Sequence, residues 1–165
     1  MGFIGAGTNT RLRHLPGLAE IDGVSLSMVA NRSEASSRAV AEEFGIARIA
    51  PDWRTVVEDP EIDAVCIGTW PYMHAEISIA ALKEGKHVLT EARMASSLGE
   101  ARAMHAESVA HPDLVAQIVP SPFTLDLDKT VVGLIESGTL GEIVEVLSPL
   151  ECIPGGKRQL EADEP

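Results

Sequence analysis

The sequence predicts an α/β fold in which a doubly wound parallel sheet lies between two layers of helices. Three observations support this prediction. Short apolar runs alternate with segments of helical period along the first two thirds of the chain, with no internal repeat. The apolar runs are continuous, which is typical of strands buried on both faces of a parallel sheet. The chain of 165 residues is 45% hydrophobic and 23% charged, a composition that supports a substantial core.

The predicted strands and helices alternate along the chain. The expected strands are 1–4, 24–30, 46–50, 64–69, 87–90 and 114–119, the first of them cut short by the start of the chain. The expected helices are 9–20, 34–44, 52–58, 73–84 and 98–109. Ser33 is a candidate N-cap and Gly45 a stop signal for the second helix, and Gly85 ends the fourth. The sequence 97–100 has the capping-box pattern and opens the fifth helix.

The alternation of apolar runs and helical segments stops at Pro120-Ser121-Pro122, which predicts a domain boundary. Residues 1–120 would form the first domain. Residues 121–165 would hold one connecting helix through Leu127, Val131, Leu134 and Ile135, one strand at 143–147 and a polar tail from 154. One helix and one strand do not complete a domain, so we expect the incomplete start of a second α+β domain, as in a fragment of a longer protein. The unpaired strand edge makes a homo-oligomer one expected assembly.

Charge and cysteine usage exclude several classes of partner. The formal net charge is −12, which argues against duplex nucleic acid and against an anionic membrane surface. No apolar run reaches the length of a membrane helix, and the N-terminus has no basic signal region. Cys66 and Cys152 show no paired spacing. We therefore expect a cytoplasmic protein.

The first site signal is Gly5-x-Gly7-x-x-Thr10, directly after the first strand. The first glycine permits a tight turn, the second allows close approach of a pyrophosphate, and the helix start at Thr8 and Asn9 supplies free N–H groups. Gly5, Gly7, Thr8 and Asn9 are therefore candidate cofactor-binding residues. Thr10 replaces the usual small residue, so we expect the helix to lie slightly farther from the strand. A plain strand–helix turn is the alternative.

The second signal is Asn31-Arg32-Ser33, at the end of the second strand. A site for NAD usually has an acidic residue here, which binds the ribose 2′-hydroxyl. A neutral residue followed by a guanidinium and a hydroxyl can instead accept a 2′-phosphate. The trio therefore favours NADP over NAD. The alternative is that Arg32 is solvated and Ser33 only caps the next helix.

The third signal is the segment after the strand 64–69, where Thr69, Trp70, Pro71 and His74 are candidates for the wall of a nicotinamide site. Loops at the carboxyl ends of strands line the ligand crevice of a doubly wound sheet. A structural turn is the alternative.

Together these segments resemble the Gfo/Idh/MocA family of NAD(P)-dependent oxidoreductases. The matching stretches are Gly-Phe-Ile-Gly-Ala-Gly at 2–7, Ala-Val-Cys-Ile-Gly-Thr at 64–69, Pro-Tyr-Met-His at 71–74, the run 80–91 that ends in Glu91, and 134–143. The resemblance implies a Rossmann-type domain that binds NAD(P) and serves hydride transfer on a sugar, sugar acid or cyclitol. It adds Glu91 to the candidate cofactor-binding residues.

Two departures from the family pattern affect catalysis. The family usually reads Glu-Lys-Pro where this chain has Glu91-Ala92-Arg93, and Ala92 can neither donate a proton nor stabilise an oxyanion. The family's substrate-binding domain is also missing from the sequence. We therefore assign no catalytic residue and no metal ligand. A non-catalytic NAD(P)-binding member is the first alternative. An S-adenosylmethionine methyltransferase is a remote one, because residues 2–4 and Asn31 lack the acidic groups of that class.

Overall fold

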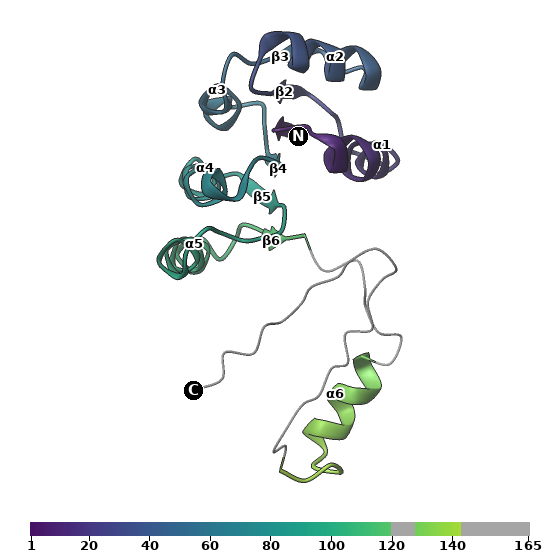
Figure 1. The fold of residues 1–165 in the computed structure, drawn as a ribbon, viewed down its shortest axis with the longest axis vertical. Coiled ribbons are helices and arrows are strands. Elements are labelled where there is room, and N and C mark those ends of the chain that lie inside the picture. Colours follow the sequence, from purple (N-terminus) through teal and green to yellow (C-terminus); the bar gives the residue numbers. More distant parts are fainter. Residues whose placement is uncertain (120–127, 143–165) are drawn as a thin grey trace, which may run out of the picture. The chain divides into compact units, whose positions relative to one another are not determined.

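The computed structural model describes residues 1–119 and 128–142. The chain divides into two compact units, Met1–Pro122 and Phe123–Pro165. The first unit contains one six-stranded sheet in the order β3-β2-β1-β4-β5-β6, with every pairing parallel (Figure 1). The strands are β1 (Gly2–Ile4), β2 (Met28–Ala30), β3 (Arg48–Ile49), β4 (Ala64–Ile67), β5 (His87–Thr90) and β6 (Ala116–Ile118). The order reverses between β1 and β4, so the predicted doubly wound sheet is confirmed.

Helices cover both faces of this sheet. They are a π-helical turn, η1 (Thr10–His14), followed by α1 (Leu15–Ala19), α2 (Glu34–Phe44), α3 (Trp53–Glu58), α4 (Pro71–Lys83) and α5 (Leu98–Ala110). Figure 1 shows α3, α4 and α5 on one face, and α1 on the other. The remaining described helix, α6 (Asp128–Glu136), belongs to the second unit. No helix in the described ranges is long and apolar enough to cross a membrane.

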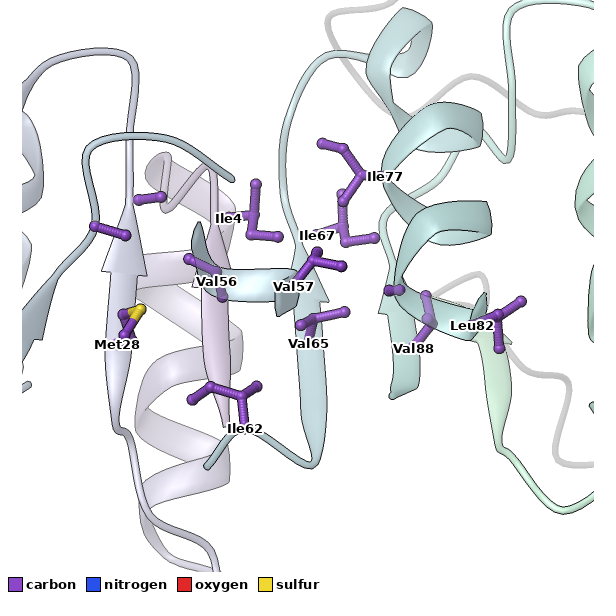
Figure 2. Close-up of a cluster of buried hydrophobic side chains, with 13 residues drawn as sticks. Ile4, Met28, Val56, Val57, Ile62, Val65, Ile67, Ile77, Leu82 and Val88 are labelled. Carbon is purple, nitrogen blue, oxygen red and sulfur yellow. The ribbon is translucent and has the colours of Figure 1, made fainter. Parts of the chain in front are cut away.

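The core consists of two apolar clusters, one on each face of the sheet. Alternate strand residues point to opposite faces, so Phe3 and Cys66 join the cluster under α1 and α2, whereas Ile4 joins the cluster under α3 and α4. Figure 2 shows the second cluster, in which side chains from α3 and α4 pack on the strands. Its largest members are Ile4, Met28, Val56, Val57, Ile62, Val65, Ile67, Ile77, Leu82 and Val88.

The predicted helix signals are confirmed by the backbone. Ser33 Oγ accepts a hydrogen bond from the Ser36 N–H at 3.3 Å, and Ser97 Oγ accepts one from the Glu100 N–H at 3.2 Å. Gly45 lies in the left-handed region with a φ of 69°, which ends α2. A cap that the sequence analysis missed is Asp52, whose carboxylate accepts from the Thr55 N–H at 3.1 Å and starts α3.

Two elements differ in detail from the prediction. The expected strand 24–30 contracts to β2, because its partner β1 offers only Gly2–Ile4 for pairing. The expected helix 9–20 is continuous from Thr8 to Ala19, and the π-helical turn η1 lies within it. The predicted strand 143–147 and the polar tail from 154 lie outside the described residues, as does Leu127.

Candidate functional site

A crevice of about 700 Å³ opens at the carboxyl ends of β1, β2 and β4, next to the point where the strand order reverses. Ligands of doubly wound folds bind at this position. The volume lies within the range of about 300–1,000 Å³ found for small-molecule pockets. The lining residues are Ile4, Gly5, Ala6, Gly7, Thr8, Ala30, Asn31, Arg32, Ser36, Pro51, Asp52, Trp53, Gly68, Thr69, Trp70, Tyr72 and Met73.

The turn after β1 forms the floor of the crevice. Gly5 has a φ of +78°, and a Cβ there would lie 2.8 Å from the Thr69 backbone N, so this position requires glycine. A Cβ on Gly7, in contrast, would meet no atom within 4 Å. The backbone at Gly7 therefore faces open space on the side where a ligand can approach.

Thr10 is accommodated in a way that the sequence analysis did not predict. The threonine side chain is buried, and a Cβ on Gly68 would lie 2.2 Å from Thr10 Oγ1 and 2.6 Å from Gly5 O. The glycine at the end of β4 therefore provides the space that the threonine takes. The wider helix–strand spacing that we expected from Thr10 stays a prediction.

Asn31 connects the glycine turn to the start of α2. Its Oδ1 accepts from the Ala6 N–H at 2.6 Å, and its Nδ2 donates to Ser36 O at 3.2 Å and Ser36 Oγ at 3.0 Å. Its own backbone N–H donates to Ser37 Oγ at 2.8 Å. Asn31 lines the crevice, but its side chain is occupied in fixing the two loops that flank it.

Two polar groups beside Asn31 remain available to a ligand. Arg32 is exposed and lines the crevice. Ser36, which the sequence analysis missed, lines it as well, and its hydroxyl hydrogen is free to donate because Ser36 Oγ is the acceptor toward Asn31. Ser33 is not among the lining residues, and its hydroxyl caps α2 as described above. The structure thus brings Arg32 together with Ser36 rather than with Ser33.

Aromatic side chains border the crevice on two sides. Trp70 and Tyr72, at the start of α4, are 68% and 66% exposed while lining it. Trp53 lines it from the start of α3, and the Arg54 guanidinium lies 4.3 Å from the centre of the Trp53 ring. Pro71 occupies the first turn of α4 and is not a lining residue.

The segment Pro51 to Trp53 was missed as part of the site. It follows β3, and loops that follow the strands of a doubly wound sheet line its ligand crevice. The signal was therefore present in the sequence, in the strand predicted at 46–50.

His74 lies in the interior rather than on the crevice wall. Its side chain is fully buried, with Nδ1 2.8 Å from Arg93 O and Nε2 3.0 Å from Thr69 O. The ring therefore joins the loop after β4 to the loop after β5. This position gives His74 a structural role and no direct access to a ligand in the crevice.

Glu91 forms a cluster with Asn9 and His14 outside the crevice lining. Asn9 Nδ2 donates to Glu91 Oε1, and His14 Nε2 lies 2.5 Å from the same oxygen. The sequence analysis predicted Asn9 and Glu91 as cofactor-binding residues but did not single out His14. Cys66 on β4 is buried nearby, and burial together with the Glu91 charge raises the pKa of its thiol to about 12.

Comparisons with known proteins agree with this geometry. Residues 1–117 match the model of the oxidoreductase family with an NAD-binding Rossmann fold, GFO_IDH_MocA. The chain is 33% identical over 104 residues to levoglucosan dehydrogenase from Pseudarthrobacter phenanthrenivorans, covering 63% of this chain and 26% of that protein. It is 36% identical over 103 residues to 1,5-anhydro-D-fructose reductase from Ensifer adhaerens, covering 62% and 31%.

A solved structure shows the same fold. Scyllo-inositol dehydrogenase from Lactobacillus casei, with bound cofactor NAD(H) and scyllo-inositol, superposes with a TM-score of 0.72 at 22% identity. The match covers 86% of this chain and 42% of that one. The chain therefore spans less than half the length of each of these three relatives.

Proposed function

The chain belongs to the Gfo/Idh/MocA oxidoreductase family, with an NAD-binding Rossmann fold, and from this premise we propose that its crevice binds NADP(H) in preference to NAD(H). We further propose that the chain is the dinucleotide-binding domain of an oxidoreductase that acts by hydride transfer on a sugar, sugar acid or cyclitol. The two relatives named above are, by their names, a levoglucosan dehydrogenase and a 1,5-anhydro-D-fructose reductase.

The open backbone at Gly7 is the observation that carries the proposal. No atom occupies the space next to it, and a helix begins directly after it at Thr8. The first turn of a helix leaves backbone N–H groups that suit a phosphate. The residues present therefore fit a pyrophosphate between the glycine turn and the crevice.

Each part of the crevice has a separate task in this proposal. Gly5 fixes the turn, Gly7 admits the pyrophosphate, and Asn31 holds the turn against α2. The rings of Trp70 and Tyr72 offer an apolar surface along one side of the ligand. When bound, the dinucleotide supplies the hydride chemistry, and the protein supplies its placement.

The preference for NADP rests on Arg32 and Ser36. A guanidinium and a hydroxyl at the end of β2 can both donate to a 2′-phosphate, and the described part of this loop presents no carboxylate to a ribose 2′-hydroxyl. Asp52 also lines the crevice, but its carboxylate is engaged in capping α3. The charge balance of the loop thus favours the phosphorylated cofactor.

Calorimetric titration with NADPH and NADH tests this preference. Wild type should bind NADPH more tightly, and Arg32→Ala should lose about 1.5–3 kcal/mol of NADPH binding with little change for NADH. Arg38→Ala is a matched control, because Arg38 pairs with Glu34 on α2 and does not line the crevice. Equal affinities in wild type, or a similar loss in both variants, would rule out the preference.

A second candidate function is NAD(P) binding without catalysis. Ala92 favours it, because this alanine stands where the family resemblance implies a lysine. The two candidates differ in whether the chain turns over a substrate. A cytoplasmic location and a homo-oligomer belong to the same proposal, and cell fractionation and light scattering test them.

A further inference from the structure

Glu91 connects two parts of the proposed dinucleotide site. It directly follows β5, and its backbone N–H donates to Ile67 O at 2.9 Å, so its backbone continues the ladder between β4 and β5. Its side chain reaches the segment that follows β1, where the glycine turn leads into η1. One residue thus joins the end of β5 to the turn that we assign to phosphate binding.

Glu91 makes both contacts through one carboxylate oxygen. Glu91 Oε1 accepts from Asn9 Nδ2, which is exposed, and lies 2.5 Å from His14 Nε2, with the Glu91 and His14 side chains 16% and 14% exposed. An ion pair on the same segment, Arg11 with Glu43, has side chains that are 43% and 44% exposed. Because screening by water weakens exposed contacts, the His14–Glu91 contact constrains the segment more strongly than the Arg11–Glu43 pair.

The residue that Glu91 contacts lies in the first turn of the helix that follows the glycine turn. Thr8 and Asn9 are already helical, Asn9 with a φ of −66° and a ψ of −44°, and the Arg11 N–H donates to Gly7 O at 3.0 Å. The Glu91 carboxylate therefore holds the start of this helix, where free backbone N–H groups can face an anionic ligand.

We propose that Glu91 is a positioning residue that, through Asn9 and His14, holds the turn from Gly5 to Asn9 in its phosphate-binding conformation. Neither Glu91 nor Asn9 lines the crevice, so the carboxylate acts on the turn rather than on the ligand. The inference rests on the proposed dinucleotide binding.

Fluorescence titration with NADPH, together with the unfolding midpoint of the same samples, tests the inference on the full chain. Glu91→Ala removes both contacts and should weaken NADPH binding about tenfold. Glu91→Gln keeps an acceptor for Asn9, and His14→Gln keeps a donor for Glu91, so both should lose less. Arg11→Gln is the matched control, because it breaks an ion pair on the same segment that does not reach β5, and it should keep wild-type affinity.

The outcomes separate this inference from the function on which it rests. A purely structural Glu91 would lower the unfolding midpoint and leave the affinity, measured well below that midpoint, unchanged, which overturns the inference. If Glu91→Ala does not fold, Asn9→Ala removes only the link to the turn and should show the same tenfold loss. Wild-type affinity in Asn9→Ala overturns the inference alone. Absence of NADPH binding by wild type overturns both.

Discussion

At the scale of single residues, the two glycines of the turn after β1 have different surroundings. Gly5 adopts a positive φ against the backbone of Thr69, whereas Gly7 faces open space. The sequence pattern predicted a tight turn at Gly5 and close approach of a ligand at Gly7, and the geometry of each position agrees with that division.

Substitution at the two positions should therefore have different effects. Gly7→Val should keep the circular dichroism spectrum and the unfolding midpoint of wild type while dinucleotide binding falls below detection, because the side chain fills the space of the pyrophosphate. Gly5→Ala should lower the free energy of unfolding by more than about 1 kcal/mol. Unchanged affinity in Gly7→Val would reduce the glycine turn to a structural role.

The Cys66 thiol gives a residue-scale prediction about reactivity. Burial raises its pKa to about 12, so the neutral thiol persists at every pH below that value and the reactive thiolate is scarce near pH 8. In a Cys152→Ser variant, an aromatic disulfide reagent at pH 8 should label Cys66 only after denaturant unfolds the protein. Rapid labelling of the native protein would show that the sheet opens around β4.

At the scale of elements, the sequence predicted what local rules determine. Ser33 and Ser97 cap the helices that they were predicted to cap. An N-cap can be predicted locally, because it needs only a side-chain acceptor and the backbone N–H three residues later in the chain. The extent of β2 was overestimated, since strand length depends on a partner strand far away in sequence. The buried position of His74 depends on Arg93, which local patterns cannot locate.

The cap of α5 offers an element-scale test. Ser97→Ala removes the acceptor for the Glu100 N–H and should lower the free energy of unfolding by about 1 kcal/mol. Dinucleotide affinity should not change, because neither residue lines the crevice. Urea denaturation and NADPH titration of the same variant measure the two quantities. Ser97→Thr, which keeps a hydroxyl, serves as the control.

At the scale of the whole molecule, the doubly wound parallel sheet and the position of the crevice followed from the alternation of elements and the rule for such sheets. The presence of Ser36 in the crevice lining, and the contact of Glu91 with His14, did not. Both depend on the directions of individual side chains. The sequence thus located the edge of the sheet that carries the site, while the contacts within it needed coordinates.

Turnover is the property that the whole chain should lack. We expect this 165-residue polypeptide to show no dehydrogenase activity on sugars, sugar acids or inositols with NADP(H). Its crevice borders on solvent at the exposed rings of Trp70 and Tyr72, and Ala92 offers no proton donor. Ala92→Lys should not restore activity, because a cation alone does not position a substrate.

Absorbance of NADPH, followed for wild type and Ala92→Lys across a panel of these substrates, measures the rate. Enzyme-dependent turnover by wild type would show that the chain completes an active site and would favour the catalytic candidate over the binding module.

The composition of the crevice rim has an optical consequence. The chain contains two tryptophans, and both of them, Trp53 and Trp70, line the crevice. The whole indole emission of the protein therefore originates beside the proposed ligand, without a distant ring to add a constant background. Reduced nicotinamide absorbs in the range where indole emits, so each bound molecule should quench this emission by energy transfer and itself become fluorescent. The fraction of crevices that hold a reduced dinucleotide can thus be measured by fluorescence in the unlabelled protein.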